Sequence, residues 1–204
     1  MEPQEIEKKS FAIIDQEAGT HGFLRQQWLI VRRIIHTSAD FDYLKSIRIH
    51  PDAIATGIGA IRAGRSIYTD TNMLRTGIRK RDLVDFGVSV HCLMADPDIA
   101  QKAARMGETR AEVAVTAVAG EMTGGIYAVG NAPTALLRLV ELIRQDKARP
   151  ALVIGLPVGF VNAAESKAAL LDQSVPFITN VGRKGGSNVA ASVINALILM
   201  ALQR

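Results

Sequence analysis

The chain has 204 residues, of which 48% are hydrophobic, 22% are charged and 5% are aromatic. This composition is typical of a folded globular protein and excludes intrinsic disorder, collagen-like repeats, small disulfide-rich scaffolds and polytopic membrane proteins. The formal net charge is +4, and the basic residues are dispersed, so a nucleic-acid groove is not indicated. A mildly basic protein of this kind suits a small substrate that carries several negative charges.

Cys92 is the only cysteine, which rules out an intramolecular disulfide and is compatible with a cytoplasmic location. Residues 1–5 are acidic and polar, so no signal peptide is expected. The longest apolar stretch, residues 189–202, is interrupted by Ser192 and Asn195 and is shorter than the roughly 20 residues that span a bilayer. We therefore expect a cytoplasmic protein without a membrane segment, whose C-terminal stretch forms a helix that is buried in the subunit or in an interface.

Apolar residues recur at helical spacing in the first third of the chain and predict helices over residues 4–18, 22–35 and 51–62. The pattern then changes to short β-rich runs, which predict strands at residues 66–69, 88–92, 126–129, 152–154 and 177–179. Helical patterns lie between most of these strands, at residues 97–106 or 110–122, 133–146, 163–172 and 186–202.

Strands that alternate with helices of this length form right-handed βαβ units and a parallel sheet. We therefore predict a single domain over residues 1–204. Its fold class is α/β, a three-layer α/β/α arrangement with a mostly parallel sheet of about five strands and an N-terminal helical segment packed outside it.

Glycine-rich or polar turns follow several of the predicted strands, at residues 69–72, 130–134, 155–159 and 180–187. Ligands bind outside the carboxyl ends of the strands in open parallel sheets, so these turns are expected to converge on one cleft. The segment 182–187 combines two cations with backbone N–H groups before a helix, whose dipole favours an anion. A turn with a solvated Arg-Lys pair explains the same segment equally well.

Three glycine motifs resemble nucleotide-binding or capping sequences. Residues 182–187 lack the Walker spacing, and residues 57–59 lack the third glycine of a dinucleotide fingerprint, so helix packing is expected at Gly57. In the turn at 130–134, Pro133 suits a first helical turn and Asn131 is a plausible cap. A nucleotide- or phosphate-binding α/β enzyme remains an alternative that rests on the 182–187 segment alone.

The histidines of the chain are His21, His36, His50 and His91. No pair of them has metal-ligand spacing with acidic or thiol partners, so no metal site is expected. His36 ends a helical segment that carries Arg32 and Arg33 one turn earlier. The helix dipole favours the cationic form of such a histidine, and the arginines oppose it. The pattern leaves a structural cap and a functional histidine both open.

Several long motifs occur in a characteristic order along the chain: residues 10–14, 33–37 with Asp40, 69–73, 130–136, 155–167 and 182–187. On these residues the chain resembles the precorrin-8X methylmutase family, including the cobalt-precorrin-8 methylmutases of cobalamin biosynthesis. The resemblance covers almost the whole chain. Slight departures at residues 38–39 and in the short N-terminus do not touch the matched functional positions.

The resemblance implies an isomerase that moves a methyl group between adjacent carbons of ring C of a corrin. The product is hydrogenobyrinate, or cobyrinate when cobalt is already inserted. It also implies a Rossmann-like subunit, no cofactor, and a homodimer with active sites near the interface. Neighbouring pathway enzymes are further candidate partners; nucleic acid and membrane are not. A non-catalytic corrinoid carrier remains an alternative.

The resemblance also implies roles for particular residues. His36 matches the catalytic histidine of the family, a proton donor and acceptor, while Ser10 and Arg33 match substrate-contacting positions. From motif position we expect these further residues to bind substrate: Thr37, Thr69, Asn131, Thr134, Arg183, Lys184 and Ser187.

Overall fold

A computed structural model describes residues 3–203 and confirms the predicted alternation of strands and helices. The strands are β1 (Ile47–Ile49), β2 (Ile67–Thr69), β3 (Val90–His91), β4 (Ile126–Val129), β5 (Leu152–Gly155) and β6 (Phe177–Asn180). The helices are α1 (Pro3–Ala18), α2 (Arg25–Ser38), α3 (Tyr43–Ser46), α4 (Ala53–Arg62), α5 (Asn72–Gly77), α6 (Pro97–Met106), α7 (Arg110–Ala117), α8 (Pro133–Arg144), α9 (Ala163–Leu171) and α10 (Ser187–Leu202), with a 3₁₀ helix, η1 (Lys80–Phe86).

The strands form one six-stranded sheet in the order β1-β6-β5-β4-β2-β3. Strands β2 to β6 pair in parallel, and β1 pairs antiparallel with β6, with Ile47 opposite Asn180. The mostly parallel sheet is confirmed, but the expected number of about five strands omitted β1. Strand β1 is defined by its pairing with β6, a partner strand far along the chain.

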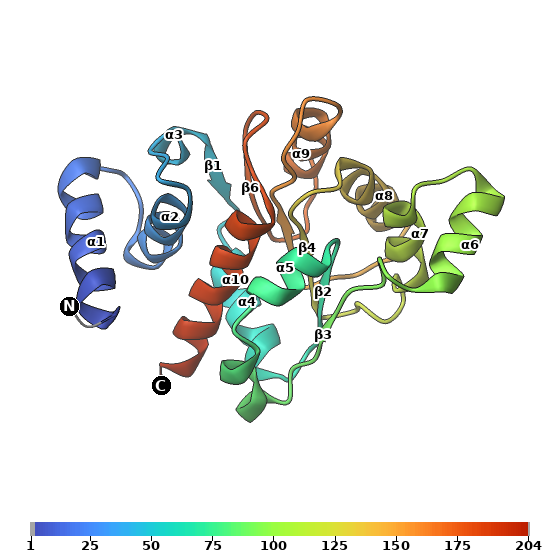
Figure 1. Ribbon diagram of the computed structural model, residues 1–204, viewed down its shortest axis with the longest axis horizontal. Coiled ribbons are helices and arrows are strands. Elements are labelled where there is room, and N and C mark those ends of the chain that lie inside the picture. Colours follow the sequence, from blue (N-terminus) through green and yellow to red (C-terminus); the bar gives the residue numbers. More distant parts are fainter. Residues whose placement is uncertain (1–2, 204) are drawn as a thin grey trace.

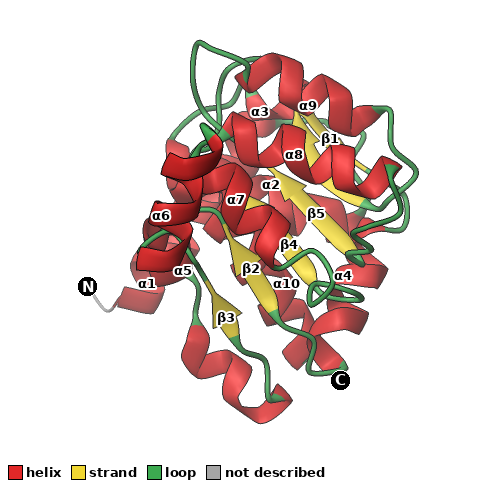
Figure 2. Ribbon diagram, turned by 90° about the vertical axis from the view of Figure 1, so that its right-hand side faces the viewer, coloured by secondary structure: helices red, strands yellow, loops and turns green. Residues whose placement is uncertain are grey.

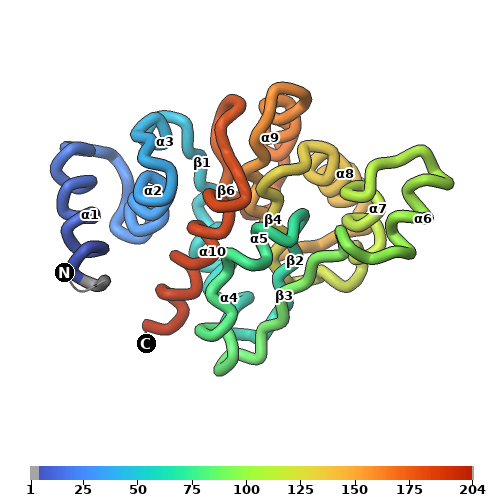
Figure 3. The backbone as a smooth tube through the Cα atoms, in the orientation of Figure 1, coloured from blue at the N-terminus to red at the C-terminus, as the bar shows by residue number. Residues whose placement is uncertain are grey.

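Helices cover both faces of the sheet, as the three-layer prediction required. Successive side chains of a strand point to opposite faces, so Ile126 and Ala128 belong to one apolar core and Tyr127 and Val129 to another. The first core packs under α2, α4, α5 and α10, and the second under α7, α8 and α9 (Figures 1 and 2). Helix α1 packs on α2, outside these layers (Figure 3).

The apolar C-terminal stretch forms α10, which is buried within the subunit along most of its length. It packs against α2, α4 and α5, so its apolar surface is used inside this chain. The packing explanation for Gly57 is also confirmed, because a Cβ there would lie 2.8 Å from a methyl carbon of Leu152. None of the helices in the described part of the chain has the length and apolarity to cross a bilayer.

The sequence predicted a helix at residues 97–106 or at residues 110–122. The structure has a helix in both places, α6 and α7, between β3 and β4. Helix α6 begins where the side chain of Asp96 accepts from the N–H of Asp98, and it ends at Gly107, whose φ is 65°. Helix α7 then begins with a capping box between Thr109 and Glu112. It ends at Ala117, and turns replace the helix that was predicted to continue to residue 122.

Candidate active site

The carboxyl ends of β2 and β4 are joined by Asp70, whose side chain is 2% exposed. Its carboxylate accepts three backbone N–H groups, from Gly130 at 2.9 Å, Asn131 at 2.8 Å and Ala132 at 2.7 Å. Burial raises the pKa of Asp70, and the three donors act against that rise. The prediction of Asn131 as the cap of α8 was wrong: Ala132 is the N-cap residue, and the carboxylate of Asp70 takes up the N–H groups of this turn.

The start of α10 lies directly against this turn. A Cβ on Gly130 would lie 2.6 Å from the Cα of Ser187, so only glycine permits so close an approach. The hydroxyl groups of Thr71 and Ser187 are 2.9 Å apart and share a hydrogen bond. The turns after β2, β4 and β6 therefore lie together at one end of the sheet.

A cavity of about 260 Å³ lies between α2, α5 and α10. Its walls are formed by Arg33, His36, Thr37, Gly77, Asn188, Ala191, Ser192 and Asn195. Three of the residues predicted from the 33–37 motif therefore face one space. The opposite wall consists of polar residues at positions i, i+4 and i+7 of α10, the same side of a helix.

His36 lies near the C-terminal end of α2, and its ring packs on Phe11 of α1 with the ring centroids 5.1 Å apart. The guanidinium carbons of Arg32 and Arg33 lie 4.4 and 5.2 Å from the centre of the same phenyl ring. Phe11 thus orients the His36 ring. Within the described residues neither ring nitrogen of His36 has a hydrogen-bond partner, so both are available to a ligand.

Helix α1 contacts one residue of this wall and carries another predicted residue. Arg33 forms an ion pair with Glu7 of α1, with Nη1 and Oε1 3.2 Å apart. Both groups are partly exposed, so a ligand carboxylate can compete with Glu7 for the guanidinium. Ser10, adjacent to Phe11, donates its hydroxyl to the carbonyl of Ile6 at 2.9 Å and is partly exposed.

The remaining predicted residues lie on the strand-end turns, outside the walls of this cavity. Thr69 is buried, and its hydroxyl donates to the carbonyls of His91 and Thr71. The side chain of Thr69 therefore links the ends of β2 and β3 within the protein. Thr134 shares a hydrogen bond with Thr109 at 3.1 Å, between α8 and the start of α7. Asn131 is exposed on its turn.

The loop between β6 and α10 is tied to the end of the helix that carries His36. Ala39, with φ 53°, ends α2 in the left-handed conformation, and the chain then turns through Asp40 and Asp42. The ammonium group of Lys184 lies 2.6 Å from a carboxylate oxygen of each. The hydrogen bond from Lys184 lowers the pKa of Asp40. The cation of Lys184 therefore already has two carboxylate partners, whereas Arg183 stacks over Phe160 at 5.6 Å.

Exposed apolar side chains occur in two of the segments that follow the strands. Phe160 is 86% exposed and Val161 is 76% exposed in the segment after β5, and Met73 is 74% exposed just after β2. Large apolar side chains exposed together commonly mark a binding surface. The site therefore combines cations with exposed apolar side chains.

The comparisons with known proteins decide the family. The sequence profile described as Precorrin-8X methylmutase matches residues 5–200. The chain belongs to the precorrin-8X methylmutase family. The resemblance found in the sequence motifs is thereby confirmed.

Individual members of the methylmutase family match the chain over nearly its whole length. The cobalt-precorrin-8 methylmutase of Priestia megaterium is 48% identical over 98% of this chain and 89% of its own length. That of Leptospira interrogans is 43% identical over 98% and 94%. The crystal structure of a precorrin-8x methyl mutase from Thermus thermophilus has a TM-score of 0.90 and 48% identity, and the match covers 97% of this chain and 96% of that one.

The sequence-based reading of this methylmutase missed several residues of the site. The polar residues of α10 could have been found from the sequence. They are Asn188, Ser192 and Asn195, which form a polar stripe on an otherwise apolar helix. Asn195 also holds the turn after α5, where it donates to the carbonyl of Gly77 and accepts from the N–H of Arg79, both at 2.9 Å. The described residues contain no group of three or more His, Cys, Asp or Glu side chains placed to hold a metal ion.

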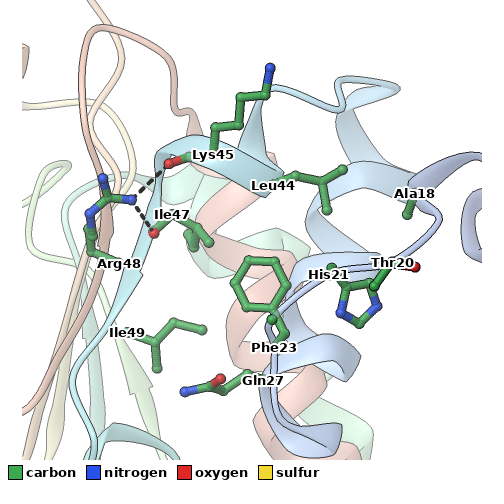
Figure 4. Close-up of a pocket in the computed structure, with 11 residues that line it drawn as sticks. Ala18, Thr20, His21, Phe23, Gln27, Leu44, Lys45, Ile47, Arg48 and Ile49 are labelled. Atoms are coloured by element: carbon green, nitrogen blue, oxygen red, sulfur yellow. Dashed lines mark hydrogen bonds between the residues drawn. The ribbon is translucent and has the colours of Figure 1, made fainter.

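A second, larger cavity of about 650 Å³ lies elsewhere in this methylmutase, between the segment after α1 and β1. Phe23 lies in the middle of Figure 4, while the side chain of Lys45 points away from it and Arg48 bonds to two backbone carbonyls. No residue predicted from the family motifs lines this cavity, so we do not assign it to the reaction.

Proposed function

We propose that the protein is a cobalt-precorrin-8 methylmutase, an isomerase that moves a methyl group between adjacent ring carbons of its corrinoid substrate to give cobyrinate. The observation that carries this proposal is the position of His36, whose ring nitrogens have no partner within the described chain and which shares a cavity wall with Arg33. The cobalt-containing substrate is proposed because the relatives from Priestia megaterium and Leptospira interrogans are named for it, whereas the Thermus thermophilus protein, at 48% identity, is named precorrin-8x methyl mutase.

The size and chemistry of the site support a tetrapyrrole ligand. A cavity of about 260 Å³ is small for a drug-sized ligand, whose sites enclose roughly 300–1,000 Å³. A macrocycle would therefore place one edge between α2 and α10 and extend over the strand-end turns. Its carboxylates would meet Arg33 and Arg183, and its apolar faces would meet residues such as Phe160. Lys184 would hold the loop to α2 through Asp40 and Asp42.

The proposed mechanism needs one proton donor and a fixed substrate. Methyl migration within a conjugated ring requires neither a nucleophile nor a resident metal from the protein. It requires the ring to be held in one tautomer and protonated at one position. His36 would donate that proton and take it back after the methyl group has moved. Thr37, on the same cavity wall as His36, and Ser10, next to Phe11 in α1, would bind polar groups of the substrate.

Turnover of cobalt-precorrin-8 tests the proposal. The purified protein, mixed with a large excess of substrate, is expected to convert all of it to cobyrinate, followed by the visible spectrum and chromatography. Conversion of the metal-free substrate alone would overturn the cobalt assignment. Binding of one equivalent without conversion would favour a corrinoid carrier. Thermal stabilisation by nucleotides, with no response to corrinoids, would favour the nucleotide-binding alternative.

Replacing Arg33 with alanine is expected to weaken cobyrinate binding by about 1.5–3 kcal/mol, the range for a hydrogen bond to a charged group. Arg33→Lys should recover only part of the lost affinity for cobyrinate, because the guanidinium binds a carboxylate through two parallel hydrogen bonds and an ammonium does not. Absorbance titration measures the affinity. Arg25→Ala, at the exposed start of the same helix, is the matched control. Equal affinity of Arg33→Ala and wild type would place the anion contact elsewhere.

We also propose that the whole chain acts as one domain and assembles as a homodimer, as the family resemblance implies. The buried α10 helix gives this no support, since its apolar face packs within the subunit. Light scattering at micromolar concentration should give about 44 kDa, twice the 22.0 kDa chain. A mass equal to one chain at that concentration would contradict the dimer.

A further inference from the structure

Lys167 places a cation inside the protein. Its side chain projects from α9 and is 1% exposed, and none of the ion pairs among the described residues includes it. Burial lowers its pKa to about 8. Lysines are almost never fully buried without a paired charge, because removing an ammonium group from water is costly. Packing alone does not explain this residue.

The ammonium group of Lys167 forms hydrogen bonds to the loop between β6 and α10 from the buried side of that loop. It donates to the backbone carbonyl of Lys184 at 2.7 Å and to Oδ1 of Asn180 at 3.1 Å. Asn180, fully buried at the end of β6, donates its own amide to the same carbonyl at 3.0 Å. Two buried side chains thus fix the direction of one peptide group in the loop.

That peptide group directs an N–H outwards. The C=O and N–H of a trans peptide point in opposite directions, and the described chain has no cis peptide bond. Because the carbonyl of Lys184 points to Lys167, the N–H of Gly185 points to the outer side of the loop. No described residue accepts it, whereas the next N–H, of Gly186, donates to the carbonyl of Leu156 at 2.9 Å.

We propose that Lys167 is a positioning residue for substrate binding, which holds residues 181–186 with the Gly185 N–H directed at a substrate carboxylate and adds positive potential beneath it. The inference rests on the proposed function, since it takes this loop as the place where a corrinoid carboxylate binds. The bound carboxylate then supplies the negative charge that the protein itself does not place beside Lys167.

The test compares Lys167→Met and Lys167→Gln, which remove the charge, with Lys147→Met, which removes an exposed lysine after α8. Cobyrinate affinity should fall by about tenfold or more in both Lys167 variants and stay unchanged in the control. The KM for substrate should rise similarly, while the single-turnover rate at saturating substrate stays within about threefold of wild type. Loss of fold alone would not separate KM from the saturated rate in this way.

A second measurement follows the loop itself without any ligand. Backbone ¹⁵N order parameters of residues 182–186 should be near the rigid value of about 0.85 in wild type and fall below about 0.6 in the Lys167 variants. A mobile loop in wild type, or unchanged affinity and order in a folded variant, would overturn the inference. If wild type binds no corrinoid, the proposed function fails, and the order parameters still report whether Lys167 fixes the loop.

Discussion

In a single-turnover experiment, the His36→Ala variant is expected to convert substrate at least about 10²-fold more slowly than wild type while it still folds and binds corrinoid. Removal of a general acid withdraws the proton from the transition state, and the rest of the binding surface remains. The ring packs on Phe11 at 5.1 Å, so a modest loosening of α1 is also expected. Circular dichroism and cobyrinate titration establish that the variant is folded and competent to bind.

The matched control is His50→Ala. His50 packs on Phe177 of β6, with the ring centroids 5.5 Å apart, and follows the end of β1. Its loss should leave the single-turnover rate near wild type. A near-normal rate in a folded, ligand-binding His36→Ala protein would leave tautomer selection by the cleft as the source of catalysis.

Replacement of Asp70 is expected to produce the largest loss of stability among single changes at the site. The Asp70→Ala variant leaves the N–H groups of Gly130, Asn131 and Ala132 without their acceptor, at a cost of about 3 kcal/mol or more. Asp70→Asn keeps one acceptor oxygen and turns an NH₂ group towards these donors, so its cost should be smaller, about 1–3 kcal/mol. Urea unfolding at neutral pH measures both.

The order of stability, wild type above Asp70→Asn above Asp70→Ala, is the discriminating result. Asp85→Asn, an exposed carboxylate in η1, controls for the change in net charge and should shift the free energy of unfolding by less than about 0.5 kcal/mol. If Asp70→Ala were as stable as wild type, the three N–H groups would have to find other acceptors. The turn that presents Asn131 and Thr134 would then not depend on Asp70.

Local patterns in the sequence determined most of the secondary structure. The helices predicted over residues 4–18 and 22–35 were predicted from apolar residues at helical spacing and the strands from short β-rich runs, and such signals act over a few positions. The placement of Arg33, His36 and Thr37 on one side of a helix could also have been found from the sequence, because residues three and four positions apart share a helix face. The family resemblance added the role of His36, which the pattern had left open.

Only the tertiary structure decided which distant groups meet. Strand β1 exists through its pairing with β6. Asp70 lies 60 positions from Gly130, and Lys184 lies 144 positions from Asp40. A carboxylate or an ammonium group has no sequence signature for its partner, because folding brings such partners together from elements far apart in the chain. The burial of Lys167 could not be read from its neighbours for the same reason: exposure depends on what the rest of the chain packs over a residue.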